Sequence, residues 1–262
     1  MLISTPKIAL DPCASDAGHD DHLAYLVDHL RQIKTDDWSG RMRPMKEFIK
    51  KVAYRSPLLS KWSAPSYPYK VNPAQLSFLC EAISNTRGSS GSILEIGVAK
   101  GDTSVFLLEH LRTTADTRTV YFLDTFAGFT DESINHEVDV RGKAVDDYDA
   151  FRYGEEGVFS RNLTRLGYEN FRTVKGDAAR QDYTRFAPID VALLDIDLYQ
   201  PTREILDHLW ENLATPGYIC VDDCMADTPW DGSLQAYNEF VENKGLQPRI
   251  VGQKGGVILR KN

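Results

Sequence analysis

The stretch SILEIGVAKGDTSVFLLEHLR, residues 92–112, joins a short apolar strand to a helix through a turn that contains two glycines. This alternation of strand and helix continues to the C-terminus. Strands are predicted at 119–124, 171–177, 189–195 and 217–223, helices at 157–167, 201–213 and 233–245, and an antiparallel hairpin at 247–252 and 255–261. Repeated strand–helix units predict an α/β fold with a mostly parallel sheet and helices on both faces. In such sheets, ligands bind at the carboxyl ends of the strands.

The residues before this domain follow a different pattern. Residues 1–20 lack periodicity and predict a tail. Apolar residues at helical spacing predict helices over 22–34, 44–54 and 74–85. We therefore expect a tail and helical extension over 1–72 and the α/β domain over 73–262.

The composition is that of an ordinary globular protein, with 42% hydrophobic and 26% charged residues among 262. A net charge of −8 argues against nucleic acid as the main partner, because phosphate binding needs a basic surface. No apolar run approaches the roughly 20 residues of a membrane span, and the N-terminus lacks the pattern of a secretory signal. Four cysteines in a chain of this length do not make a disulfide framework. We therefore expect a cytoplasmic protein that binds neither nucleic acid nor membranes.

The glycine turn LEIGVAKGDTS, residues 94–104, has the spacing G-x-x-x-G. A dinucleotide site requires G-x-G-x-x-G, and Ala99 stands where that pattern needs its second glycine. Glycines allow the backbone to approach a ligand closely, and the N-terminus of the following helix presents free N–H groups. The pattern E-x-G-x-x-x-G from Glu95 to Gly101 resembles the first motif of class I S-adenosylmethionine-dependent methyltransferases. A turn that merely joins strand to helix is the alternative.

Two further acids end predicted strands. Asp124 follows Gly97 by 27 residues and could accept hydrogen bonds from both hydroxyls of a ribose, in an NAD enzyme as well as in a methyltransferase. Gly176 and Asp177 end the strand over 171–177. In methyltransferases this position often contacts the adenine amino group, although an Asp in a turn serves equally well as a helix cap. These acids indicate a nucleoside without separating the two cofactors.

Four acids follow two neighbouring strands of the predicted sheet. Asp195 and Asp197 end one strand, and Asp222 and Asp223 end the next. Adjacent strands lie about 4.8 Å apart, so these carboxylates are expected to converge. Crowded carboxylates repel one another, and a hard cation such as Mg²⁺ relieves that repulsion while leaving positions for substrate oxygens. The alternative is that only one or two of the acids point inward and the rest are solvated.

The segment at about 130–158 is too long for a tight connection between a strand and a helix. Long insertions at this edge of a sheet are either functional lids or disordered segments, and the sequence leaves both open. His136, inside the insertion, is the one histidine placed to reach the site. Cys220 and Cys224 lack the further ligands of a zinc site, and Cys220 is predicted to lie in the core.

The D-x-D triplet in LLDIDLYQPT, residues 193–202, occurs in several chemistries. Haloacid-dehalogenase-type phosphatases carry D-x-D-x-T/V on the first strand, whereas here the triplet ends the fourth predicted strand and the fifth residue is Tyr199. A glycosyltransferase that binds Mn²⁺ and a nucleotide sugar would fit the acids but would leave the glycine turn and Asp124 without a role. A methyltransferase uses every feature.

Taken in order, LEIGVAKGDTS, LDTFAGF, LLDIDLYQPT and GYICVDD resemble the macrocin O-methyltransferase family, which methylates sugar hydroxyls on antibiotics and related glycosides. The resemblance extends over about 73–245. It implies a seven-stranded Rossmann-like sheet, S-adenosylmethionine as cofactor and Mg²⁺ as metal. The family often has Cys where this chain has Ile96, a difference at a buried strand position that leaves the chemistry intact. The first 40 residues and the insertion are unmatched, so the acceptor is not specified.

By this resemblance, Asp195, Asp222 and Asp223 bind the metal and Asp197 is the general base, although Asp195 and Asp197 could exchange roles. The implied cofactor-binding residues are Glu95, Gly97, Val98, Gly101, Thr103, Ser104, Asp124, Thr125, Phe126, Gly176, Asp177 and Asp195. The hypothesis is that a metal-bound hydroxyl of a sugar or other vicinal diol attacks the sulfonium methyl group while Asp197 takes the proton. The alternatives are a metal-dependent glycosyltransferase and a phenol or catechol O-methyltransferase. A homodimer is compatible with the sequence.

Overall fold

The computed structural model describes residues 43–56, 65–148 and 155–261. The chain divides into two compact units between Tyr67 and Pro68, a few residues before the boundary that we expected at 72. In the first unit, helix α2 (Arg43–Arg55) confirms the helix predicted over 44–54. The tail and the helix predicted over 22–34 lie outside the described residues.

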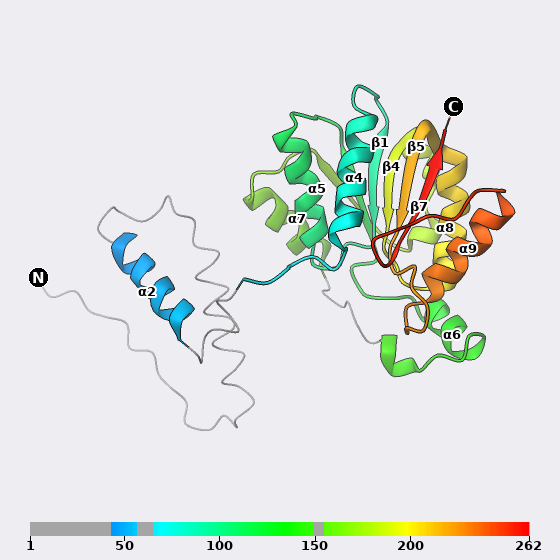
Figure 1. The fold of residues 1–262 in the computed structure, drawn as a ribbon, viewed down its shortest axis with the longest axis horizontal. Coiled ribbons are helices and arrows are strands. Elements are labelled where there is room, and N and C mark those ends of the chain that lie inside the picture. Colours follow the sequence, from blue (N-terminus) through cyan, green and yellow to red (C-terminus); the bar gives the residue numbers. More distant parts are fainter. Residues whose placement is uncertain (1–42, 57–64, 149–154, 262) are drawn as a thin grey trace, which may run out of the picture. The chain divides into compact units, whose positions relative to one another are not determined.

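The second unit is built on a seven-stranded sheet in the order β3-β2-β1-β4-β5-β7-β6 (Figure 1). Its strands are β1 (Ser92–Ile96), β2 (Val120–Asp124), β3 (Phe171–Lys175), β4 (Ile189–Leu194), β5 (Leu213–Val221), β6 (Ile250–Val251) and β7 (Gly255–Arg260). The first five strands are parallel, and β7 pairs antiparallel with both β5 and β6. The predicted Rossmann-like sheet with a closing antiparallel hairpin is therefore confirmed.

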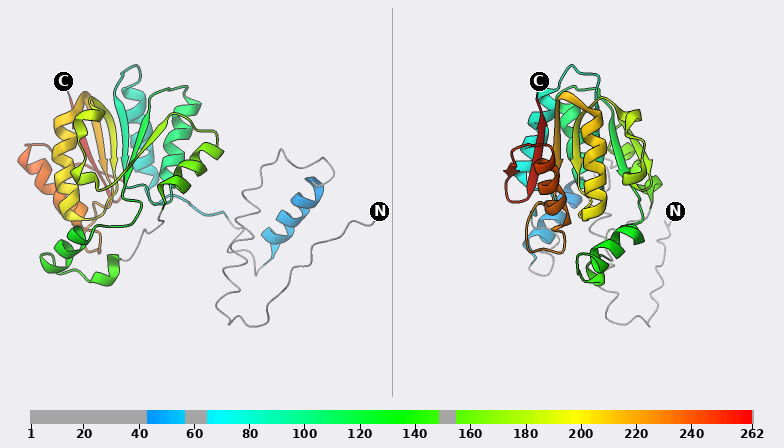
Figure 2. Two further views of the ribbon diagram at one scale, coloured as in Figure 1. Left: turned by 180° about the vertical axis from the view of Figure 1, so that it is seen from behind. Right: turned by 90° about the vertical axis from the view of Figure 1, so that its right-hand side faces the viewer.

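Helices cover both faces of the sheet (Figures 1 and 2). One face carries α4 (Pro73–Asn85), α5 (Asp102–Thr113) and α7 (Glu156–Arg165), and the other carries α8 (Tyr199–Asn212) and α9 (Gly232–Asn243). Short 3₁₀ turns η2 (Val145–Tyr148), η3 (Ala178–Arg180) and η4 (Tyr183–Phe186) complete the connections. Helix α6 (Asp131–Asp139) packs on α8, beyond the carboxyl ends of the parallel strands (Figure 1).

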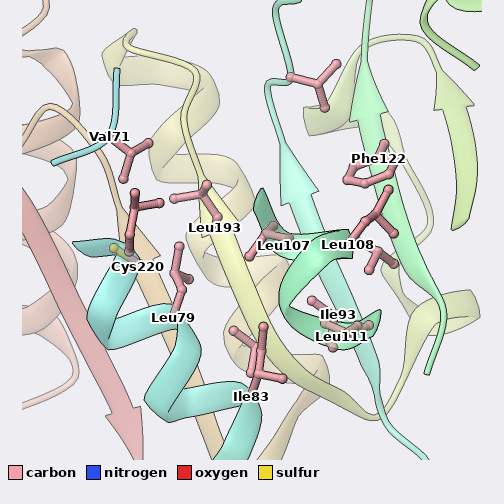
Figure 3. Close-up of a cluster of buried hydrophobic side chains, with 14 of the residues drawn as sticks. Val71, Leu79, Ile83, Ile93, Leu107, Leu108, Leu111, Phe122, Leu193 and Cys220 are labelled. Carbon is pink, nitrogen blue, oxygen red and sulfur yellow. The ribbon is translucent and has the colours of Figure 1, made fainter. Parts of the chain in front are cut away.

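The central strands are buried on both faces, and their residues alternate between the two helical layers. On β4, Leu193 joins the cluster under α4 and α5, whereas Ala192 and Leu194 join the cluster under α8 and α9. Figure 3 shows the first cluster, in which Cys220 lies among aliphatic side chains. Cys220 is fully buried, as predicted.

Two helix starts bear on the site. Helix α4 begins with a capping box, in which the Asn72 side chain accepts the Gln75 N–H and the Gln75 side chain accepts the Asn72 N–H, both at 3.1 Å. Helix α8 begins at Tyr199, so our expectation that Pro201 would be its first residue is wrong. Proline is still tolerated there, because the first N–H groups of a helix have no partner within it.

At the amino ends of the strands, buried charges are fully paired. The Arg118 guanidinium lies 2.6 Å from Asp116 and 2.8 Å from Asp190, and it donates to the carbonyl oxygens of Ile83 and Thr86. This cluster ties α4 to the sheet.

Candidate active site

A cavity of about 500 Å³ opens at the carboxyl ends of β1, β2, β4 and β5. This volume suits a small-molecule ligand, since such pockets measure about 300–1,000 Å³. The predicted site residues that line this cavity are Glu95, Gly97, Val98, Gly101, Thr103, Asp124, Thr125, Asp177, Asp195, Asp197, Asp222 and Asp223. The sheet therefore gathers most of the predicted site residues around one cavity.

The glycine turn after β1 packs directly on the turn after β4. Gly97 has a φ of +84°, and a Cβ placed on it would lie 1.8 Å from the Asp195 carbonyl oxygen. We expected this glycine to let the backbone approach a ligand closely, whereas its close neighbour in the structure is the protein backbone. Gly101, with a φ of +94°, precedes α5 and has the Phe159 ring 2.8 Å from the position of its missing Cβ.

Asp124 joins this turn to the one after β2. One of its carboxylate oxygens accepts the Val98 N–H at 2.8 Å and the other accepts the Phe126 N–H at 2.6 Å. Its side chain is fixed at the cavity wall, and Oδ2 keeps a free lone pair, whereas Oδ1 also lies 3.5 Å from the Thr125 hydroxyl. Asp124 is therefore placed to receive hydroxyl donors from a ligand.

Glu95 is a buried carboxylic acid that faces the same cavity. It is 1% exposed, and its Oε2 has no hydrogen-bond partner among the described residues. Burial raises the pKa of Glu95 to about 8. Buried polar groups are normally hydrogen-bonded, so this oxygen indicates a donor that a ligand supplies.

Three predicted cofactor residues do not line the cavity. Phe126 packs on Phe159 in the core with ring centroids 5.5 Å apart, and only its backbone N–H reaches the site, through Asp124. Ser104 is fully buried, and Gly176 lies outside the cavity wall. Asp177 caps η3, accepting the Ala179 N–H at 3.0 Å, so the helix-cap interpretation is confirmed. It also lines the cavity, and its contact with an adenine stays a prediction.

The four acids after β4 and β5 separate into a group of three and a single residue. Carboxylate oxygens of Asp195, Asp197 and Asp223 all lie within 4.8 Å of one another. Asp197 and Asp223 have φ values of +62° and +52°, a left-handed conformation in which Asp and Asn are enriched. This set of hard oxygen donors fits a divalent cation such as Mg²⁺.

Asp222 instead has both oxygens occupied by the protein. One accepts the Gln75 side-chain amide at 2.7 Å, and the other lies 2.9 Å from the Lys254 ammonium. The metal set implied by the resemblance, with Asp222 in place of Asp197, thus differs from the set that the geometry brings together.

These acids perturb one another strongly. Burial, followed by repulsion from Asp222 and its neighbours, raises the pKa of Asp195 well above its usual range. Burial and the adjacent Asp223 do the same to the pKa of Asp197. Burial lowers the pKa of Lys254, but attraction from Asp222 and Asp223 outweighs it and raises that pKa overall. The single lysine therefore does not offset the mutual repulsion of the four acids.

An aromatic cluster of Phe129, Tyr148 and Trp230 lies at the cavity. Phe129, from the turn after β2, lies 5.9 Å from Trp230, from the loop after β5. Tyr148 contacts both rings and donates to the Pro229 carbonyl at 3.0 Å. Since β1 and β4 lie between β2 and β5, these loops meet across the strand ends that carry Glu95 and Asp195. Phe129 and Trp230 both line the cavity.

The described part of the insertion is held in place by buried charges. Glu137 is fully buried; it pairs with Arg141 and accepts the Tyr199 N–H at 2.7 Å, at the start of α8. Arg141 and Lys143 both pair with Asp231, at 2.8 and 2.7 Å. These contacts join residues 131–148 to α8 and to the loop after β5, and Ser133 of this segment lines the cavity.

One predicted residue is not part of the site, and several residues of the site were not predicted from the sequence. His136 stacks on Tyr199 at 5.4 Å and does not line the cavity, so the prediction that it reaches the site is wrong. Gln75, Lys254, Phe129 and Trp230 were not predicted. Gln75 is visible in the sequence only as part of a capping box, and nothing in the sequence shows that its amide reaches Asp222.

Comparison with known proteins identifies the family of this chain and similar folds. The macrocin O-methyltransferase (TylF) family model matches residues 72–260, most of the chain. The chain belongs to this family. Its sheet resembles that of the O-methyltransferase NovP, with a TM-score of 0.65 and 20% identity over 75% of this chain and 84% of that one.

Two curated relatives come from Streptomyces. One, from Streptomyces olivaceus, is 8-demethyl-8-(2,3-dimethoxy-alpha-L-rhamnosyl)-tetracenomycin-C 4'-O-methyltransferase, 29% identical over 53% of this chain and 55% of its own length. The other, from Streptomyces niveus, is demethyldecarbamoylnovobiocin O-methyltransferase, 28% identical over 56% of this chain and 58% of its own length. The chain spans little more than half the length of these relatives. Among the described residues, no helix is long and apolar enough to cross a membrane.

Proposed function

We propose that this chain transfers the methyl group of S-adenosylmethionine to a hydroxyl group of a sugar or other vicinal-diol acceptor in natural-product biosynthesis. The observation that carries this proposal is the convergence of Asp195, Asp197 and Asp223 beside the glycine turn in one cavity. The names of the two Streptomyces relatives support a glycoside of an antibiotic as the acceptor.

The cavity wall fits a cationic amino acid joined to a nucleoside. Glu95 offers a buried carboxylate oxygen without a protein partner, which suits the ammonium group of the cofactor. Asp124, fixed by two backbone N–H groups, would accept hydrogen bonds from the ribose hydroxyls. Asp177, two residues after β3, would accept a hydrogen bond from the adenine amino group.

The acids fit a hard divalent cation. Asp195 and Asp223 would hold it, whereas both oxygens of Asp222 are held by Gln75 and Lys254. A bound Mg²⁺ would lower the pKa of an acceptor hydroxyl and orient its oxygen. Asp197 lies within 4.8 Å of Asp195 and Asp223 and remains available as the base.

In this proposal Asp197 takes the hydroxyl proton while the acceptor oxygen forms a bond to the methyl carbon. The carbon–sulfur bond breaks, and its electron pair stays on sulfur, which leaves neutral S-adenosylhomocysteine. The Phe129 and Trp230 side chains close the cavity on the acceptor side, where their rings could pack on the C–H face of a sugar. They also keep water away from the reacting atoms.

Calorimetry with S-adenosylhomocysteine and Mg²⁺ tests the proposal. We expect binding in the micromolar range, followed by Mg²⁺-dependent methylation of rhamnosides detected by mass spectrometry. Activity on catechol but on no glycoside would indicate a phenol methyltransferase. Binding of a nucleotide sugar such as TDP-glucose, without binding of S-adenosylhomocysteine, would overturn the proposal.

Glu95 should make cofactor binding depend on pH. Its carboxyl is protonated below a pKa of about 8, so affinity for S-adenosylhomocysteine should fall as pH decreases from 8 to 6. The fall should approach about tenfold per pH unit. Glu95→Gln should remove this slope and weaken binding about 10- to 100-fold at pH 8.5, because a charged hydrogen bond is lost.

The control is the stability of the ligand-free variant. The pKa of Glu95 is higher in the folded protein than in the unfolded chain, so ionisation destabilises the fold as pH rises through about 8. Glu95→Gln should therefore raise the Tm at pH 8.5 while it weakens binding. An unchanged pH slope in the variant would refute the role of Glu95.

A further inference from the structure

Lys254 lies beside the acids but takes no step in the proposed reaction. It lies in the turn between β6 and β7, and its carbonyl oxygen accepts the Cys224 N–H at 2.8 Å. Cys224 follows Asp223 directly, so this bond attaches the turn to the chain segment that carries the acids. The backbone of Lys254 is therefore fixed relative to Asp222 and Asp223.

The side chain completes this attachment with two ion pairs. The ammonium lies 2.9 Å from Asp222 and 2.7 Å from Asp223, and the side chain is only 19% exposed. Among the ion pairs of the described residues, Lys254 is the only partner of the four acids after β4 and β5. Gln75 holds the other oxygen of Asp222. Asp222 is thus fixed from two sides.

Asp223 is shared between two environments. Its carboxylate contacts Lys254 and also belongs to the group of three carboxylates that suits a metal ion. The four carboxyl groups outnumber the single ammonium beside them, so the site is negatively charged when they are ionised. A divalent cation is attracted by this charge, but it would be repelled by the ammonium bound to one of its own ligands.

We propose that Lys254 is a permanent counter-ion of the acidic site, which positions Asp222 and Asp223 in the metal-free protein and weakens the binding of Mg²⁺. This inference rests on the proposed function, because that function supplies the metal. It makes Lys254 a positioning residue that keeps the metal exchangeable. The two effects of removing its charge have opposite signs, and this distinguishes the role from a merely structural one.

The test is Lys254→Met, with Mg²⁺ itself as the ligand. In calorimetry at pH 7.5 and constant ionic strength, we expect the variant to bind Mg²⁺ about tenfold more tightly than the wild type, because the neighbouring positive charge is gone. Without Mg²⁺ the Tm of the variant should be lower, because Asp222 and Asp223 lose their partner. Saturating Mg²⁺ should restore most of that loss.

Two variants serve as controls. Lys254→Arg keeps the charge and should bind Mg²⁺ as the wild type does. Lys244→Met makes the same change in net charge at the half-exposed pair with Asp207, and should leave Mg²⁺ affinity unchanged. S-adenosylhomocysteine binding, measured separately, reports whether each variant keeps its cofactor site.

Weaker or equal Mg²⁺ binding by a folded Lys254→Met, judged by its S-adenosylhomocysteine binding, would overturn the inference and leave the proposed function intact. If Lys254→Met does not fold, Lys254→Gln carries the same expectation. A wild-type protein that binds S-adenosylhomocysteine but no Mg²⁺ would overturn the metal site and this inference together.

Discussion

Asp197→Asn is expected to reduce kcat by about 10²- to 10⁴-fold, the range attributed to a general base. Asparagine has nearly the same shape but cannot take the proton. It also tolerates the left-handed conformation that Asp197 adopts, with a φ of +62°. The backbone between β4 and α8 should therefore stay in place, and the loss should be one of chemistry.

Three measurements separate this outcome from others. Affinity for S-adenosylhomocysteine should be unchanged, and turnover in single-turnover experiments should fall as much as kcat. Asp227→Asn makes the same replacement at an exposed residue with a φ of +60° that does not line the cavity, and should leave kcat unchanged. Near-native turnover of Asp197→Asn would refute its role as base and favour Asp195.

Gly97→Ala is expected to destabilise the protein by at least about 4 kcal/mol, among the largest effects of a single substitution. The new Cβ would lie 1.8 Å from the Asp195 carbonyl oxygen, which belongs to the backbone and has little freedom to move. The φ of +84° adds a further penalty. Relief of this overlap requires the turns after β1 and β4 to separate, which would displace Asp195 and Asp197.

Gly88→Ala isolates the conformational part of that cost. Gly88 has a φ of +91°, but nothing lies within 4 Å of the position of its missing Cβ. This control should lose only about 1–2 kcal/mol. Urea denaturation followed by circular dichroism compares the two variants. Equal losses would show that the contact between the two turns does not constrain the site.

Most elements of the α/β domain were predictable because they follow from local sequence, but α6, within the insertion, was not predicted. Strand–helix alternation and the apolar spacing in each segment predicted the sheet, the helices and the closing hairpin. Acids placed directly after apolar strands identified the ligand-binding edge, because parallel strands all end at that edge. The boundaries of α8 were less accurate, since Pro201 is compatible with several positions in the first turn.

The composition of the acid cluster was not predictable from sequence. Asp222 and Asp223 are neighbours in the chain, yet one is held by Gln75 and Lys254 and the other joins Asp195 and Asp197. Side-chain direction past a strand end depends on backbone torsions, such as the φ of +52° at Asp223, and no residue pattern specifies them. The partners are also distant in sequence: Gln75 lies 147 residues and Lys254 32 residues from Asp222.

The amino-acid sequence by itself determined the parallel sheet, the edge at which a ligand binds and the set of acids available there, because local periodicity and strand polarity suffice for these. Only the tertiary structure decided that residue 97 must lack a Cβ because the Asp195 carbonyl oxygen lies against it. It also decided that Phe129 contacts Trp230 across the ends of two strands and that Lys254 pairs with two of the acids. These contacts join segments that are far apart in the chain. They depend on packing geometry, which a one-dimensional pattern does not contain.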